Sequence, residues 1–212
     1  MSKLLNFKVL FGFGVAVFLC AVILLAWLRF SPVTVAADWK YDVLQENLDR
    51  ITSLARLSDG RLLATLSAKQ RAGQLGGGQL VQLDIAGGKY TVLAGKLYKP
   101  DGLMPYKNGV VITQEFSDQP VLLWSESRIN PIFMLVKPES ITATQNGRWL
   151  IVEDAMNGRL IEFNPQDGKQ AILYTGFEAG EGVCVGRDQR IFVVDNKSSD
   201  LLEFVIEKKK KI

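Results

Sequence analysis

Three acidic side chains recur at the same place in three successive repeats of the sequence. They are Asp101, Glu139 and Glu181, each of which is the second residue of a repeated unit whose fourth residue is apolar. Carboxylates that are brought together repel one another, so some of them must take up a proton or a cation. A hard cation with oxygen ligands is the natural partner, and calcium tolerates irregular geometry best. These three residues are the candidate ligands for calcium or another divalent cation.

A second set of acids closes the same units. If the first strand of each unit runs along a central channel and the second runs back, the opening and closing acids share one mouth of that channel. Glu115 and Asp195 are the candidates for a general base there. Alternatively, these acids are solvated or cap the adjoining turns, and the sequence does not fix a catalytic residue. The closing acids are Glu115, Glu153 and Asp195, and Asp154 follows directly after the second of them.

The composition excludes several kinds of chemistry. Histidine is absent, which excludes Ser-His-Asp and Cys-His catalysis and zinc sites with histidine ligands. Of the two cysteines, Cys20 lies in a long apolar segment and is not expected to pair with Cys184. The net charge is only +3, and no basic stripe is interleaved with aromatic residues, so nucleic acid is not an expected partner.

The acids lie on short β-rich runs separated by Gly, Asn and Asp turns. Four similar units begin 49, 38 and 42 residues apart, which is the period of a propeller blade. A third apolar strand follows each unit, and a fourth follows the first three, as in KYTVLAGKL at residues 89–97. The pattern predicts an all-β fold, a small β-propeller of four four-stranded repeats over residues 40–207. The units occupy residues 51–66, 100–115, 138–153 and 180–195.

The last unit lacks a fourth strand of its own. Residues 40–48, KYDVLQENL, match residues 89–97 in Lys, Tyr, Val, Leu and the final Leu. An N-terminal strand is therefore predicted to complete the last blade and close the ring. The alternatives are an open stack of sheets, or part of a larger ring built with a partner chain.

The repeat PDGL with NGVVITQE, together with RWLIVEDAMNGRLIEF and GEGV with RIFVVDN, resembles the superfamily of SMP-30/gluconolactonase, strictosidine synthase-like and NHL-type propellers. The resemblance covers most of residues 40–207 and implies a divalent ion, often calcium, on the central axis. The matching ligand positions are Asp101, Glu139 and Glu181, whereas Thr52 departs from the pattern in the first repeat. Those domains usually have six blades, which is a second departure.

An uncharged segment precedes the repeats. Residues 9–28 are long enough to cross the hydrocarbon layer as a helix, and Lys3 and Lys8 precede them. This pattern predicts a signal-anchor in the inner or plasma membrane, with the domain on the periplasmic or extracellular side. The alternative is a signal peptide cleaved after Ala37. The expected layout is a cytoplasmic tail at residues 1–8, the anchor at 9–28, a linker at 29–39, the propeller at 40–207 and a basic tail at 208–212.

Two functions fit these features. The first is a membrane-anchored propeller outside the cytoplasm that binds a protein partner or a small ligand at its acidic mouth. The second, implied by the resemblance, is a metal-dependent lactonase or esterase-like hydrolase, in which the ion polarises a carbonyl or the attacking water. The reduced repeat number and Thr52 favour the binding function.

Overall fold

The computed structural model of the chain describes residues 2–30, 36–44, 48, 50–67, 76–116 and 119–205. The chain divides into two compact units, Met1–Val43 and Leu44–Ile212. The first unit contains helix α1, which runs Ser2–Phe30. Among the residues whose side chains are described, no helix is long and apolar enough to cross a bilayer, which takes about 20 apolar residues. The membrane span expected at residues 9–28 is therefore not supported by the structure.

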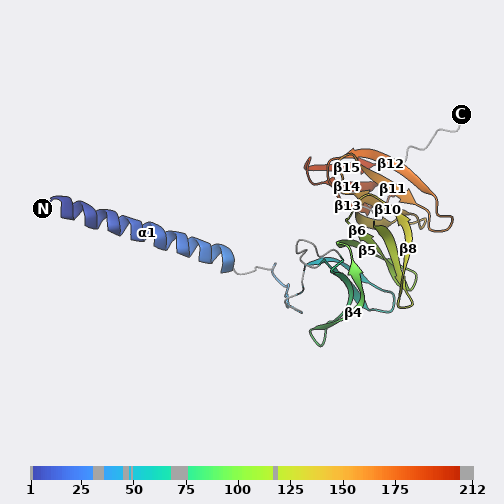
Figure 1. The fold of residues 1–212 in the computed structure, drawn as a ribbon, viewed down its shortest axis with the longest axis horizontal. Coiled ribbons are helices and arrows are strands. Elements are labelled where there is room, and N and C mark those ends of the chain that lie inside the picture. The colour runs from blue at the N-terminus through green and yellow to red at the C-terminus, as the bar shows by residue number, and fades with distance from the viewer. Residues whose placement is uncertain are drawn as a thin grey trace. The chain divides into compact units, whose positions relative to one another are not determined.

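The second unit is all-β and consists of four antiparallel sheets, the blades of a four-bladed propeller (Figure 1). Blade one contains β1 (Ile51–Arg56), β2 (Leu62–Leu66), β3 (Gly78–Asp84) and β4 (Lys89–Leu97). Blade two contains β5 (Pro100–Tyr106), β6 (Gly109–Gln114), β7 (Pro120–Ser125) and β8 (Arg128–Met134). Blade three contains β9 (Pro138–Ala143), β10 (Trp149–Glu153), β11 (Gly158–Phe163) and β12 (Gln170–Phe177). Blade four contains β13 (Gly180–Val185), β14 (Ile191–Asp195) and β15 (Asp200–Phe204).

The fourth blade differs from the prediction because its sheet has three strands in the described part of the chain. Residues 40–44 form no strand and are exposed, whereas residues 45–47 of the expected strand lie outside the described residues. The completing strand at 40–48 is therefore not found where the structure can show it. The match of residues 40–48 to residues 89–97 reflects a similar strand propensity. Strand propensity alone does not specify the sheet edge with which a strand pairs.

The four sheets pack through apolar faces, and the second strands of blades one to three are buried on both sides. Val111 and Ile112 of β6 are both fully buried, yet they face different neighbours. Ile112 belongs to the cluster between blades one and two, and Val111 belongs to the cluster between blades two and three. A third cluster, containing Leu150 and Val193, joins blades three and four. The continuous apolar runs of the second strands therefore follow from burial between two sheets.

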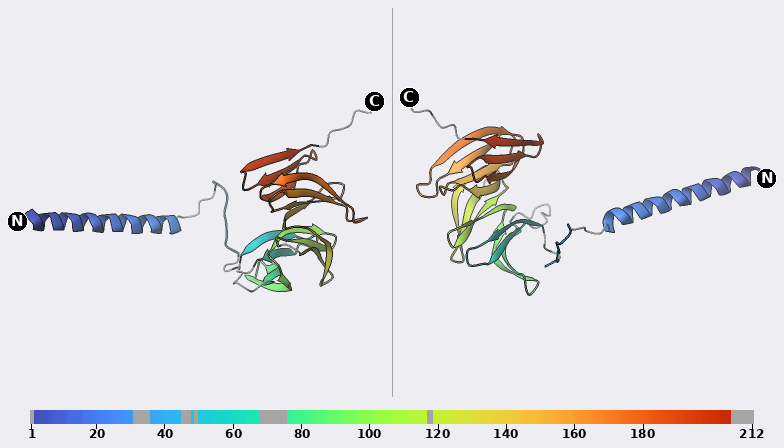
Figure 2. Two further views of the ribbon diagram at one scale, coloured as in Figure 1. Left: turned by 45° about the horizontal axis from the view of Figure 1, so that its top comes forward. Right: turned by 180° about the vertical axis from the view of Figure 1, so that it is seen from behind.

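In the described part of the chain, the ring of blades does not close between the fourth blade and the first. Extensive contacts join neighbouring inner strands, namely β1 with β5, β5 with β9 and β9 with β13. Within the described residues, no comparably extensive contact joins β13 back to β1. The sheets follow one another from β4 to β15 across the unit, and both further views show the same succession (Figures 1 and 2). The inner strands thus form a row with two ends.

The repeats align with one shift that the sequence does not reveal. Leu103 of β5 pairs with Ile112, whereas the corresponding Ile141 of β9 pairs with Ile151. The hairpin of blade two is therefore one residue shorter than that of blade three. As a result, Gln114, and not Glu115, is the structural counterpart of the closing acids of blades three and four.

Candidate functional site

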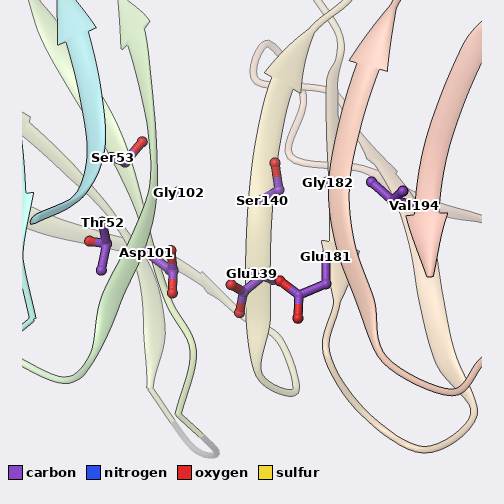
Figure 3. A pocket seen from close by; sticks show the side chains of 9 residues that line it. All are labelled: Thr52, Ser53, Asp101, Gly102, Glu139, Ser140, Glu181, Gly182 and Val194. Atoms are coloured by element: carbon purple, nitrogen blue, oxygen red, sulfur yellow. The ribbon is translucent and has the colours of Figure 1, made fainter. Parts of the chain in front are cut away.

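The three opening acids line one pocket on the row of inner strands. Asp101, Glu139 and Glu181 lie at one level on β5, β9 and β13, and the Glu181 carboxylate turns toward Glu139 (Figure 3). The pocket has a volume of about 350 Å³. The predicted convergence of these three side chains on one site is what the structure shows. The remaining lining residues are Thr52, Ser53, Gly102, Ser140, Gly182 and Val194.

Small residues after the acids let the inner strands approach closely. A Cβ atom on Gly102 would lie 2.6 Å from the backbone oxygen of Glu139 and 2.6 Å from Oγ1 of Thr113. Such distances are far inside van der Waals contact, so only glycine fits at this position. The Thr113 hydroxyl donates a hydrogen bond to the Glu139 carbonyl at 2.5 Å and accepts one from the Gly102 amide at 2.7 Å. This hydroxyl therefore ties β5 to β9 directly behind the acids.

Asp101 and Glu139 form a coupled pair of carboxyl groups. Burial, followed by the charge and hydrogen bond of Asp101 and the charge of Glu181, raises the pKa of Glu139 to about 8. Burial also raises the pKa of Asp101, against the hydrogen bond with Glu139 and the charge of Lys99. The Oε2 atom of Glu139 is buried without a hydrogen-bond partner among the described residues. Near neutral pH the pair therefore holds a proton, which a base could remove or a bound cation could displace.

Glu181 is the third acid of the pocket but is not equivalent to the other two. Its Oε1 accepts a hydrogen bond of 3.0 Å from Nδ2 of Asn196, which follows β14. Its negative charge helps to raise the pKa of both Asp101 and Glu139. Glu181 thus adds negative potential at the blade-four side of the pocket while keeping a partner of its own.

Glu115 lies beside the acid pair, at the mouth that the sequence predicts the opening and closing acids to share. One carboxylate oxygen each of Asp101, Glu115 and Glu139 lies within 4.8 Å of the others. Glu115 is buried and forms a salt bridge with Lys99, and Nζ of Lys137 lies 3.8 Å from its Oε1. The two ammonium groups therefore compensate the charge of Glu115. Asp101 and Glu139 remain the pair without a comparable counter-charge.

The two lysines are site residues that the sequence reasoning missed. Lys137 also donates hydrogen bonds to the backbone oxygen of Asp154 at 2.7 Å and to its carboxylate at 2.8 Å. Lys99 and Lys137 have positive φ angles of 45° and 47°, and each precedes a proline. Their backbone oxygens accept hydrogen bonds of 2.9 Å from the amides of Glu115 and Asp154. The signal is the Lys-Pro pair that immediately precedes Asp101 and Glu139, at residues 99–100 and 137–138.

Asp195, the other candidate base, lies outside the pocket and caps backbone groups. Its two carboxylate oxygens accept hydrogen bonds from the amides of Glu178 at 2.7 Å and Ala179 at 3.0 Å. Burial raises its pKa, but these bonds and those from Ser198 and Lys197 outweigh it, so the pKa of Asp195 is lowered. A carboxylate held ionised by amide groups is a weak proton acceptor.

Glu153 and Gln114 take the same structural place in the preceding blades. The Oε1 atom of Glu153 accepts a hydrogen bond of 2.9 Å from the amide of Val136, and Arg159 pairs with both of its carboxylate oxygens. Gln114 accepts the corresponding bond of 2.8 Å from the amide of Tyr98. The side chain at the closing position thus accepts a hydrogen bond from the backbone that leads from one blade into the next. A neutral amide side chain can do this as well as a carboxylate.

Thr52 replaces the acid in blade one, and its hydroxyl points to protein groups. It donates a hydrogen bond of 2.7 Å to the carbonyl of Pro100 and lies 3.0 Å from Oγ1 of Thr65. The hydroxyl therefore links β1 to β5, as Thr113 links β5 to β9. The anionic part of the pocket is thus confined to blades two to four.

The donor set suits a hard cation better than an anion. Three carboxylates, two of which share a proton, face a pocket whose other described polar groups are serine and threonine hydroxyls. Oxygen-only ligands of this kind suit calcium, magnesium or manganese. The residues therefore fit a divalent cation, or the cationic group of a larger ligand.

No protein-family model matches the sequence, and no curated protein matches it either. Solved structures do resemble it. A luciferin-regenerating enzyme shares 15% identity at a TM-score of 0.55, covering 70% of this chain and 54% of that one. A catalytically inactive virginiamycin B lyase from Staphylococcus aureus, with quinupristin, shares 19% identity at a TM-score of 0.54, covering 79% and 59%. A protein assigned as a gluconolactonase shares 14% identity at a TM-score of 0.52, covering 74% and 63%.

These likenesses establish the propeller fold and no more, because the identities lie far below those of proteins that keep a common function. The chain spans between 54% and 63% of the length of these structures. It therefore corresponds to a part of each of their propellers.

Proposed function

We propose that this chain is a binding module of the β-propeller type that takes a cation, or the cationic group of a ligand, in the pocket lined by Asp101, Glu139 and Glu181. The observation that carries the proposal is the coupled pair Asp101 and Glu139, in which the pKa of Glu139 is raised to about 8. Two carboxyls with one proton between them are an incomplete cation site. A bound cation would displace the proton and relieve the repulsion.

The lysines support binding over unspecific attraction of counter-ions. Lys99 and Lys137 neutralise Glu115, so the negative charge of the pocket is concentrated at Asp101, Glu139 and Glu181. A ligand that carries a cation is therefore positioned between β5, β9 and β13. Calcium is the simplest probe, because it accepts carboxylate ligands in irregular geometry.

Calcium should stabilise the full-length chain against heat. At a free concentration 100 times the dissociation constant, binding adds about 2.7 kcal/mol to the free energy of unfolding. This corresponds to a rise of about 5–10 °C in Tm for a domain of this size. Binding should strengthen between pH 6 and pH 8, because Glu139 must lose its proton. Titration calorimetry and thermal unfolding, each with calcium and with a chelator, measure both effects.

The double variant Glu139→Gln with Glu181→Gln should lose the calcium response. Glu126→Gln is the matched control, because Glu126 is an exposed acid in the turn between β7 and β8 and lies outside the pocket. It should respond as the parent chain does. An absent heat of binding together with an unchanged Tm at millimolar calcium would refute a calcium site here.

The second candidate function is a metal-dependent hydrolase of lactones or related esters. The likeness of fold to a protein assigned as a gluconolactonase favours it. In this case the cation held by Asp101 and Glu139 would polarise the carbonyl. Glu115 is then the better placed of the two candidate bases, since Asp195 is occupied by backbone amides. Calcium-dependent lactone hydrolysis that Glu115→Gln abolishes, while calcium binding persists, would favour this candidate.

The placement of the module rests on the sequence alone. We propose that residues 9–28 anchor it in a membrane and that the propeller faces the periplasm or the extracellular side. The uncharged segment and the lysines that precede it support this arrangement.

A further inference from the structure

The outward face of blade four is apolar and exposed. Leu201 of β15 is 71% exposed, Val194 of β14 is 45% exposed, and the Cys184 thiol of β13 is free and exposed. Together with Phe192 they line a depression of about 270 Å³ that also reaches Ser140, Gly182 and Val183 of the inner strands and adjoins the acid pocket. The blade-four face is defined here by Cys184, Phe192, Val194 and Leu201. It lies on the side of the sheet opposite to Ile191 and Val193, which pack against blade three.

The same positions are buried in the preceding blades. Phe192, Val194 and Leu201 correspond by strand pairing to Leu150, Val152 and Leu160 of blade three. All three of the latter are 0% exposed and pack against blade four. In blade two the equivalents of Phe192 and Leu201 are Val111 and Val121, which are buried against blade three. The blade-four face therefore has the composition of a blade–blade interface. A surface that fits it is the apolar face of another sheet.

Blade one of the same chain does not supply that sheet. Within the described residues, no extensive contact joins β13 or β14 to blade one. The face of blade one that points away from blade two carries Ala64, Leu66 and Val81, which are buried in a cluster that Leu48 joins. The apolar side chains of that face are thus already buried, and Leu48 packs against them. In the described part of the chain, the blade-four face is the sheet face that offers uncovered apolar side chains at blade–blade positions.

We propose that two copies of the chain associate through their blade-four faces, in a symmetric dimer about a two-fold axis. A two-fold interface requires a patch that complements itself. The rim of the face meets this requirement, because Arg190 pairs with Glu203 at 2.6 Å and with Asp188 at 2.5 Å. A second copy brings acids to the arginine and an arginine to the acids, whereas a face of one sign would repel its own copy. The apolar centre and the mixed rim are typical of a specific interface.

Thiol protection tests the proposal on the full-length chain. In a Cys20→Ser background, Cys184 is the one remaining thiol. Its rate of maleimide labelling should fall at least tenfold as the protein is raised from about 0.1 µM to about 100 µM, a range suited to a weak dimer with a small interface. Sedimentation at the same concentrations should show the mass changing from one copy to two.

Leu201→Lys should abolish both the protection and the doubling of mass. Ile172→Lys is the matched control, because Ile172 is an apolar β12 residue with 55% exposure that lies off the blade-four face. It should dimerise as the parent does. A labelling rate that stays fast at every concentration would overturn the proposal. A dimer in which Cys184 stays fully reactive would also overturn it, since the copies would then meet elsewhere.

Discussion

At the scale of single residues, acids with the same sequence signal have different tasks. The opening acids of three repeats meet in one pocket, and the shared second position in the repeat was sufficient to predict this. The closing acids divide, because Asp195 and Glu153 cap backbone amides while Glu115 joins the acid pair. The sequence does not distinguish these roles, because they depend on the hairpin of blade two being one residue shorter. No single residue type indicates that difference in length.

The raised pKa of Glu139 predicts a pH-dependent stability. The folded chain keeps the Glu139 proton up to a pH of about 8, whereas an unfolded glutamate loses it near its ordinary value of 4.5. The folded state therefore binds more protons between these values, and the free energy of unfolding falls as the pH rises through this window. We expect Tm, measured in chelator, to decrease from pH 5 to pH 8.

Glu139→Gln should flatten that decrease and raise Tm at pH 8, because the amide is neutral at every pH. Each kcal/mol regained corresponds to about 2–4 °C for a chain of this size. Glu126→Gln should retain the slope of the parent. Equal slopes for the parent and Glu139→Gln would show that the Asp101–Glu139 pair does not hold the proton.

At the scale of strands, the position of the acids depends on how closely the inner strands approach. Gly102 and the Thr113 hydroxyl set the separation of β5 and β9, and Thr52 performs the same task between β1 and β5. The sequence predicted the second and third strands of each blade well, because continuous apolar runs and turn residues mark them. It did not predict the role of Thr52, which was interpreted only as a missing acid.

Gly102→Ala should destabilise the chain by about 1–3 kcal/mol, the usual cost of forcing extra atoms into a packed site. The added methyl group would meet the Glu139 carbonyl and the Thr113 hydroxyl at 2.6 Å. Denaturant unfolding measures the loss. Gly95→Ala in β4 is the control, since a Cβ atom there meets nothing within 4 Å and should cost far less. A Gly102→Ala variant as stable as this control would mean that β5 and β9 can separate freely.

At the scale of the whole molecule, the period of the repeats predicted the four blades, but not how the ring ends. The repeat period indicates that each blade packs against its neighbours. It does not indicate what the first and last blades pack against. The expected completing strand at residues 40–48 is not found in the described residues, and β13 and β1 do not meet extensively there. Ring closure depends on contacts between distant parts of the chain, which local sequence patterns do not encode.

The proposed membrane placement predicts a protease result. Protease added outside intact cells or spheroplasts should digest the propeller, because the anchor holds it on the outer side. An epitope fused before Ser2 should stay protected until lysis and serves as the internal control. Protection of the propeller in intact cells, with digestion only after lysis, would place it on the cytoplasmic side.

The backbone conformation of Lys99 and Lys137 affects which substitutions these two positions can accept. A non-glycine residue with positive φ is disfavoured, and a following proline restricts it further. Glycine would relieve this strain at both positions, but it would remove the ammonium groups that neutralise Glu115. Stability and charge balance therefore make opposite demands on these residues. A search for sequences of maximum thermal stability would tend to replace these two lysines and, in doing so, erase the electrostatics of the pocket.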